Sequence, residues 1–135
     1  MTNHQCTTLV LHCIDFRLQK ALLDWGTKNN ILGDCDVVST AGAVKNILAP
    51  ESDVMRNIAI AEKLHGITKV ILINHTDCGA YGGAKAFASK KEEVEKHLAD
   101  LTAAESHIKK DFPKLSVRKF IADIQKDCDI DIREY

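Results

Sequence analysis

The segment Val70-Ile71-Leu72-Ile73 is the most apolar run of the chain, and the predicted fold is built around it. A short continuous run of aliphatic and β-branched residues is typical of a central strand covered on both faces of a parallel sheet. Reactive side chains follow it at once, in the segment His75-Thr76-Asp77-Cys78-Gly79. Because ligands bind beyond the carboxyl ends of the strands in such sheets, this segment is a candidate site.

Further strands and helices are predicted on either side of this central strand. Strands are expected over residues 7–11, 36–39 and 117–124, and a last one over 129–133 could pair back beside its neighbour. Helices are expected between them. The first helix is marked by apolar residues at helical spacing, which are Leu18, Ala21, Leu22 and Trp25. The second begins at the N-cap Ser52 and ends at Gly66, with inward-facing residues Val54, Ile58, Ala61 and Leu64. The third begins with the capping-box pair Ser89 and Glu92 and is stopped by Pro113.

This alternation predicts an α/β fold built on a mostly parallel four-stranded sheet of order 2-1-3-4. Helices flank the sheet, and the fifth strand could add to its edge in the antiparallel direction. No repeat or linker divides the chain, so residues 1–135 are expected to form a single domain. In this order strands 1 and 3 are adjacent and a crevice opens beyond their ends. The segment after strand 1, Cys13-Ile14-Asp15-Phe16-Arg17, would meet the segment of residues 75–79 there.

Composition excludes several classes of function. The formal net charge is −1 with no basic stripe, which argues against nucleic acid as a partner. The longest apolar run is too short to span a bilayer, and the first residues show no pattern of a secretory signal. The chain has 5 cysteines, an odd number that fits reduced thiols better than a disulfide framework. A cytoplasmic location is therefore expected.

Cys13, His75 and Cys78 are the candidate ligands of one zinc ion per chain. His75-x-x-Cys78 places two donors within one turn, and Cys13 arrives from the neighbouring strand end. Two sulfurs and one imidazole favour zinc over magnesium or calcium, while iron or cobalt could bind in vitro. Three protein ligands would leave the fourth position to water or substrate. The alternative is that the cysteines are small buried hydrophobes and the histidine a hydrogen-bonded loop residue.

Asp15 and Arg17 are the candidate catalytic pair. They stand two residues apart, so in an extended segment both leave the same side of the chain as Cys13. A guanidinium keeps a carboxylate ionised and fixes its orientation. The carboxylate could accept a hydrogen bond from a zinc-bound hydroxide, or could itself occupy the fourth zinc position. The alternative is a surface ion pair at a helix N-terminus.

The remaining candidate residues are assigned structural roles. His12 alternates with Cys13 along its strand, so it is expected to pack against the core or a helix. The histidines expected to be solvated on helices, without partners at ligand spacing, are His65, His97 and His107. The cysteines expected to be reduced structural thiols are Cys6, Cys35 and Cys128. The glycines that could form an anion-binding turn are Gly79, Gly82 and Gly83.

The motif Cys13-x-Asp15-x-Arg17, followed by His75-x-x-Cys78-Gly79, resembles the paired signature of the β-class carbonic anhydrases. Residues 37–42, VVSTAG, resemble the segment between the two motifs, with Ser39-Thr40 where the family usually has Arg-Asn. The resemblance implies zinc on the two cysteines and the histidine, with the Asp15–Arg17 dyad beside the metal. It also implies a homodimer or a higher homo-oligomer, with the active site near the subunit interface.

The activity that this resemblance implies is the reversible hydration of carbon dioxide to bicarbonate by a zinc-bound hydroxide, the reaction of a carbonate dehydratase. Asp15 would accept the hydrogen of that hydroxide, and Arg17 would keep Asp15 ionised and in place. Related short members of the superfamily act on carbonyl sulfide or carbon disulfide, and the ligand motif does not separate these substrates. A non-catalytic zinc protein on the same scaffold is the alternative from another class.

Overall fold

One five-stranded sheet forms the centre of the computed structural model, which describes residues 4–135. The strands are β1 (Thr8–His12), β2 (Cys35–Ser39), β3 (Lys69–His75), β4 (Ser116–Ile124) and β5 (Ile130–Glu134). Their order is β2-β1-β3-β4-β5; the first four are parallel, and β5 pairs antiparallel with β4 at the edge. The predicted α/β class, strand order and edge strand are confirmed.

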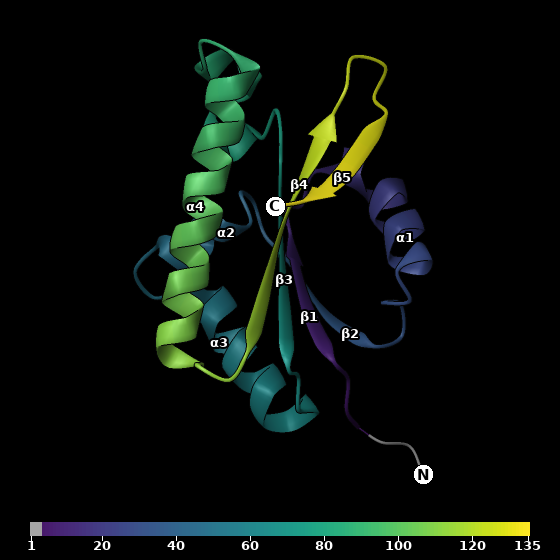
Figure 1. Cartoon of the computed structure of the whole chain (residues 1–135), viewed down its shortest axis with the longest axis vertical. Coiled ribbons are helices and arrows are strands. Elements are labelled where there is room, and N and C mark those ends of the chain that lie inside the picture. The colour runs from purple at the N-terminus through teal and green to yellow at the C-terminus, as the bar shows by residue number, and fades with distance from the viewer. Residues whose placement is uncertain (1–3) are drawn as a thin grey trace.

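Helices cover both faces of the sheet (Figure 1). The regular helices are α1 (Gln19–Lys28), α2 (Val44–Leu48), α3 (Asp53–Ile60) and α4 (Lys90–Asp111). Four shorter turns are η1 (Phe16–Leu18), η2 (Ala61–His65), η3 (Gly79–Tyr81) and η4 (Ala84–Ala86). In Figure 1, α1 lies on one side of the sheet, and α2, α3 and α4 lie on the other. Of these, α2 was not predicted, because five residues carry too little periodicity to be recognised.

The helix starts confirm the N-caps expected from the sequence. The Ser52 hydroxyl accepts a hydrogen bond from Met55 N–H at 3.0 Å, and the Ser89 hydroxyl accepts one from Glu92 N–H at 3.2 Å. The Glu92 carboxylate, however, accepts from Ala88 N–H instead of the N–H of Ser89, so the reciprocal capping box is incomplete. Helix α4 ends at Asp111, before the predicted stop at a proline.

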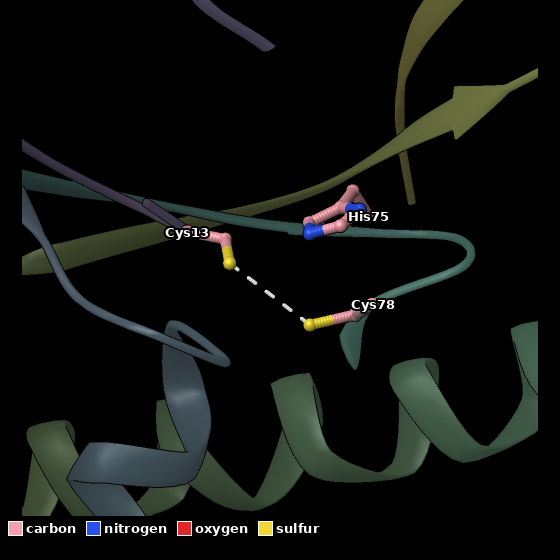
Figure 2. Close-up of side chains that lie close together, drawn as sticks. All are labelled: Cys13, His75 and Cys78. Atoms are coloured by element: carbon pink, nitrogen blue, oxygen red, sulfur yellow. Dashed lines mark hydrogen bonds between the residues drawn. The ribbon is translucent and has the colours of Figure 1, made fainter. Parts of the chain in front are cut away.

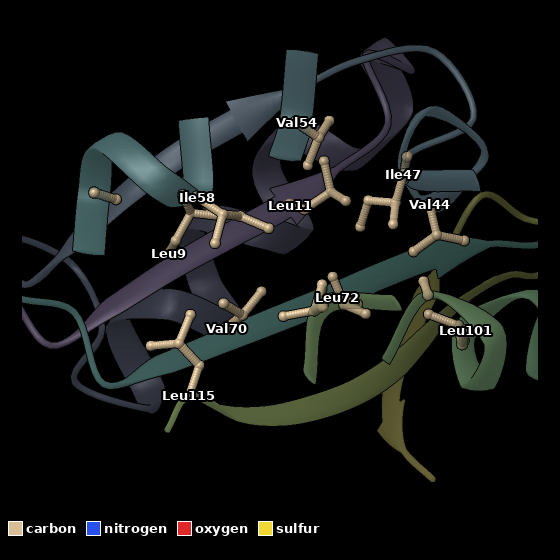
Figure 3. Packing of buried hydrophobic residues seen from close by; sticks show 14 of the residues in the cluster. Leu9, Leu11, Val44, Ile47, Val54, Ile58, Val70, Leu72, Leu101 and Leu115 are labelled. Carbon is tan, nitrogen blue, oxygen red and sulfur yellow. The ribbon is translucent and has the colours of Figure 1, made fainter. Parts of the chain in front are cut away.

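The core consists of two clusters, one on each face of the sheet. The larger lies between the sheet and α2, α3 and α4, and Figure 3 shows Leu11, Val70 and Leu72 of its strands interleaved with helix residues such as Ile58. The smaller lies under α1 and includes Ile71 and Ile73 of β3. Alternate residues of β3 thus enter different clusters, so the central strand is covered on both faces, as predicted.

The prediction that Leu64 faces inward is wrong, because this side chain is 58% exposed. The helix changes at Ala61 from α-helical to π-helical winding, which adds residues per turn. The wider turn rotates Leu64 away from the sheet. Gly66 then ends the helix in the left-handed conformation, with φ 67°, as the sequence predicts.

Among residues 4–135, no helix combines the length and the apolar character needed to cross a bilayer.

Candidate metal centre

The predicted metal ligands meet beyond the carboxyl ends of β1 and β3. Cys13 follows the last residue of β1, His75 is the last residue of β3, and Cys78 lies in the loop after it. Their ligand atoms all lie within 4.8 Å of one another, and Figure 2 shows the side chains directed into the same space. Cys13 is 5% exposed, and His75 and Cys78 are each 1% exposed. The structure therefore brings all three candidate ligands together in a buried group.

This donor set fits a tetrahedral metal. Nδ1 of His75 lies 2.7 Å from the carbonyl oxygen of Thr76, and a hydrogen bond there places the proton on Nδ1 and the lone pair on Nε2. Nε2 is buried and has no hydrogen-bond partner among the described residues. The sulfurs of Cys13 and Cys78 are 4.0 Å apart. Two thiolates on one tetrahedral zinc would be roughly 3.8 Å apart, given Zn–S bonds of about 2.3 Å.

Hydrogen bonds to the Cys13 sulfur favour its thiolate form. One hydrogen bond joins the two sulfurs, and with the Cys78 thiol as its donor it lowers the pKa of Cys13 and raises the pKa of Cys78. The backbone N–H of Gly42 also donates to the Cys13 sulfur, at 3.5 Å. Gly42 has φ +75°, and a Cβ there would lie 2.9 Å from the Cβ of Ala80. The loop after β2 therefore packs directly against the loop that carries Cys78.

Asp15 and Arg17 form a bidentate ion pair beside the donors. Arg17 Nη2 lies 2.7 Å from Asp15 Oδ2, and Nε lies 3.0 Å from Oδ1. The Asp15 carboxylate also accepts the backbone N–H of Arg17, capping η1. The hydrogen bonds from Arg17 lower the pKa of Asp15 to about 2. Asp15 Oδ2 lies 3.8 Å from Nε2 of His75, so the ionised carboxylate adjoins the candidate metal position.

Asp77 connects the ligand loop to its surroundings, a role that the sequence motifs did not predict. Its Oδ2 and its carbonyl oxygen each accept from Arg17 at 3.0 Å. Its Oδ1 accepts from Ala84 N–H at 2.8 Å, a bond that lowers the pKa of Asp77. Its own N–H donates at 2.7 Å to the carboxylate of Glu93, which is 3% exposed. Asp77 has φ 54°, a left-handed conformation that aspartate tolerates better than most residues. An aspartate directly after a strand was therefore the sequence feature that could have indicated this turn.

The predicted anion-binding turn is occupied by an anion of the chain itself. Gly82 and Gly83 have φ 87° and 77°, and they carry the chain around the Asp77 carboxylate toward Ala84. A Cβ on Gly83 would lie 3.1 Å from Asp77 Oδ1. The turn therefore holds Asp77 in place.

A buried polar network links α4 to the end of β3. Asn74 Nδ2 lies 3.0 Å from Nδ1 of His97 and 3.2 Å from the Tyr81 hydroxyl, which donates to Asp100 at 2.8 Å. Lys96 pairs with Asp100 at 3.0 Å. The prediction that His97 is solvated is wrong: its side chain is 0% exposed, and burial lowers its pKa to about 4. The face of α4 turned toward β3 carries polar side chains that bond to one another.

The other histidines differ in their environments. His12 lines an apolar groove with Trp25 of α1, as expected for packing against a helix. His107 is exposed, as predicted. The prediction that His65 is solvated, without a partner at ligand spacing, is wrong, because its side chain is half-buried and its Nδ1 lies 2.6 Å from a carboxylate oxygen of Asp36. Three cysteines were predicted to be reduced structural thiols. All three are free, and they are Cys6, Cys35 and Cys128.

Comparison with known sequences gives matches over nearly the whole chain. A family model described as "Putative carbonic anhydrase" matches residues 2–130. An uncharacterized protein of Rickettsia conorii is 30% identical over 132 residues, covering 89% of this chain and 69% of that protein. Beta-carbonic anhydrase 1 of Mycobacterium tuberculosis is 36% identical over 70 residues, covering 52% of this chain and 37% of that enzyme.

Solved structures with the same fold are also carbonic anhydrases. The carbonic anhydrase of Streptococcus mutans superposes with a TM-score of 0.57 at 21% identity, over 99% of this chain and 85% of its own. The β-carbonic anhydrase isoform I of Trichomonas vaginalis has a TM-score of 0.62 at 11% identity, over 98% of this chain and 81% of its own. At these identities the likeness establishes the fold.

Proposed function

Because the chain belongs to the β-class carbonic anhydrase family, we propose that it catalyses the zinc-dependent, reversible hydration of carbon dioxide to bicarbonate. The observation that carries this proposal is the buried group of Cys13, His75 and Cys78, with the unpartnered Nε2 of His75 among its donors. An ionised carboxylate adjoins these donors, at 3.8 Å from that nitrogen. A metal that only stiffened the fold would need no such group beside it.

We propose one zinc ion per chain at the three donors. When bound there, zinc supplies Lewis acidity and lowers the pKa of a coordinated water to about 7, so that a nucleophile exists at neutral pH. The chain provides three donors for a metal with four tetrahedral positions, which leaves one position for chemistry. The low exposure of the donors keeps bulk water away and strengthens electrostatic interactions in the site.

We assign Asp15 the role of hydrogen-bond acceptor for the reacting water. Its Oδ2 accepts from Arg17 and, with a second lone pair, can accept the hydrogen of that water. A water held in this way directs its lone pair at the carbon of the substrate. Arg17 acts as a positioning residue: it keeps Asp15 ionised and, through its bonds to Asp77, ties the carboxylate to the ligand loop.

We propose that the working unit is a homodimer or a larger homo-oligomer. Ile14 and Phe16 flank Asp15 and are 63% and 78% exposed, and Val37 on the edge strand β2 is 60% exposed. A second copy of the chain that covers these apolar side chains would lie beside the Asp15–Arg17 pair. The free cysteines are consistent with a reducing compartment, and we place the protein in the cytoplasm.

Substitution of Asp15 tests the catalytic proposal. Asp15→Ala removes the acceptor and keeps all three metal donors, so we expect unchanged zinc content and a hydration rate lower by roughly 100-fold or more. Asp24→Ala, at an exposed aspartate of α1 paired with Lys20, is the matched control and should leave both unchanged. Undiminished turnover in Asp15→Ala would remove this residue from the mechanism.

Carbonyl sulfide and carbon disulfide offer an electrophilic carbon to the same nucleophile, so the site is compatible with both. Each belongs in the same assay as a second substrate. A zinc-loaded chain that hydrates none of the three would be a non-catalytic zinc protein on this scaffold.

A further inference from the structure

We propose a second metal site, formed by Cys6, Asp36 and His65 at the amino ends of the parallel strands. One ligand atom from each of these residues, a thiol sulfur, a carboxylate oxygen and an imidazole nitrogen, lies within 4.8 Å of the other two. All three residues are half-buried. The inference is independent of the proposed carbonic anhydrase activity, because it concerns the opposite end of the sheet.

Three separate segments converge to make this cluster. Cys6 precedes β1, Asp36 is the second residue of β2 and lies opposite Leu9 of β1, and His65 is the last residue of η2. The N–H of Cys6 donates to the carbonyl oxygen of His65 at 3.0 Å, which fixes the entering chain against the helix end. In Figure 1 this is the lower end of the sheet, near the label N.

The helix end that presents His65 has unusual geometry. Residues 61–65 form a π-helical turn, which Gly66 closes in the left-handed conformation with φ 67°. Such turns are rare and are frequently found at functional sites, because the inserted residue reorients a side chain. Here the turn exposes Leu64 and directs His65 at Asp36.

The His65 ring has a hydrogen-bond partner on each side. Nδ1 lies 2.6 Å from Oδ2 of Asp36, and Nε2 lies 3.0 Å from Nε2 of His4, whose ring is centred 4.6 Å away. Two imidazole nitrogens at this distance share a hydrogen bond. The Asp36 carboxylate only accepts, so in the metal-free chain Nδ1 carries the proton of that 2.6 Å hydrogen bond. A metal at this site takes the place of that proton on Nδ1, and His65 then carries its proton on Nε2 and donates it to His4. A partner behind the ring that fixes the tautomer is the usual support of a metal-binding histidine.

The spacing of the donors suits zinc after a small adjustment. An oxygen and a nitrogen on one tetrahedral zinc are roughly 3.3 Å apart, given bonds of about 2.0–2.1 Å. The Asp36–His65 contact must therefore open from 2.6 Å, and both side chains have room to move because they are 30% and 25% exposed. A mixed sulfur, nitrogen and oxygen set favours zinc or cobalt over calcium and magnesium.

This second site should bind a metal ion with lower affinity than the first. It has one sulfur where the first has two, and its donors are half-buried where those of the first are buried. A metal held there would join the segment before β1 to β2 and to η2, and so would stabilise this end of the sheet.

The experiment is a metal titration of the untagged chain. We expect two zinc ions per chain from wild type, and one from Cys6→Ala and from His65→Gln. Cobalt gives the second readout, because each Co–thiolate bond adds to a near-ultraviolet charge-transfer band: Cys6→Ala should lose about one third of the band intensity, in proportion to three sulfurs in all. Cys128→Ser, at an exposed thiol outside the cluster, is the matched control and should keep both ions.

Two results would overturn the proposal. One is a wild-type chain that binds a single metal ion and loses it in Cys78→Ser, which places that ion at the first site; the other is a folded Cys6→Ala variant that binds as many ions as wild type. Far-ultraviolet circular dichroism establishes folding, and His65→Gln, at a half-buried position, decides the matter if Cys6→Ala does not fold. Cys78→Ser separates the two sites, because it should abolish the first and leave the cobalt–thiolate signal of Cys6.

Discussion

Gly42→Ala tests whether the loop after β2 supports the metal centre as closely as the structure shows. A residue with a Cβ in the left-handed conformation of Gly42, φ +75°, costs roughly 1–2 kcal/mol. The new Cβ would also lie 2.9 Å from the Cβ of Ala80, and relief of such overpacking costs about 1–3 kcal/mol. We therefore expect a total destabilisation of about 2–5 kcal/mol.

Gly33→Ala is the matched control for the backbone contribution. Gly33 has φ +79°, but no atom of residues 4–135 lies within 4 Å of a Cβ built there, so only the conformational cost applies. The difference between the two variants, roughly 1–3 kcal/mol, isolates the close contacts of the new Cβ, which are with Ala80 Cβ and with Lys45 Cδ at 3.1 Å. For a chain of this length it corresponds to about 4–10 °C in Tm, since unfolding entropy is about 2.1 cal/mol/K per residue.

Thermal unfolding and zinc titration of both variants provide the assay. Gly42→Ala should have a lower Tm than Gly33→Ala and should bind zinc more weakly. The backbone must move to relieve the contact between the new Cβ and Ala80, and this movement disturbs the loop of Cys78 and the Gly42 N–H that donates to the Cys13 sulfur. Ala80→Gly should restore part of the loss in the Gly42→Ala background. Equal Tm and equal zinc affinity in the two single variants would show that the loop after β2 does not support the metal centre.

Three further predictions concern groups around the site. Because the pKa of His97 is about 4 in the folded chain and about 6.5 in the unfolded chain, stability should be complete above pH 6.5 and should fall by up to about 3 kcal/mol as pH drops to 4. The free energy of unfolding, measured with urea at several pH values, should not fall in this way in His97→Gln. If its pH dependence in His97→Gln were the same as in wild type, His97 would not be the group responsible. Glu93→Ala leaves Asp77 N–H unpaired and should cost about 1–3 kcal/mol in the same assay, whereas Glu95→Ala, on the exposed face, should cost under about 0.5 kcal/mol. Phe16→Asp should lower the mass measured by light scattering to that of a monomer, and retention of the wild-type mass would exclude this residue from the interface.

The strand order and the meeting point of the candidate ligands could be predicted from the sequence, because local patterns mark the strands and the usual order of a doubly wound sheet places strands 1 and 3 side by side. The apolar run before His75 marks a central strand, and donors at the ends of two strands meet wherever those strands are adjacent. The Cys13 and Cys78 sulfurs accordingly lie 4.0 Å apart although 65 residues separate them in the chain.

The polar surroundings of the site could not be predicted in this way. Glu93, His97 and Asp100 lie on the buried face of α4, but at helical spacing a polar residue indicates solvent exposure unless its partners are known. Those partners, Asp77 and Asn74, come from the ligand loop and from β3. Such contacts depend on tertiary packing, which no local pattern contains.

The π-helical turn is a second feature that the sequence did not reveal. Leu64 continues the apolar spacing of α3, so the pattern predicts that it is buried. The change of winding at Ala61 breaks that spacing and brings His65 beside Asp36. An exposed leucine and a paired histidine thus have one physical cause.

The proposed catalysis by Cys13, His75, Cys78 and Asp15 can be measured by stopped-flow hydration of carbon dioxide on the zinc-loaded, untagged chain, with carbonyl sulfide as second substrate. We expect carbon dioxide hydration well above the buffer rate at neutral to alkaline pH, and its loss in Cys78→Ser, which lacks one of the proposed zinc donors. A folded, zinc-loaded wild-type chain that turns over neither substrate would contradict the proposed catalysis.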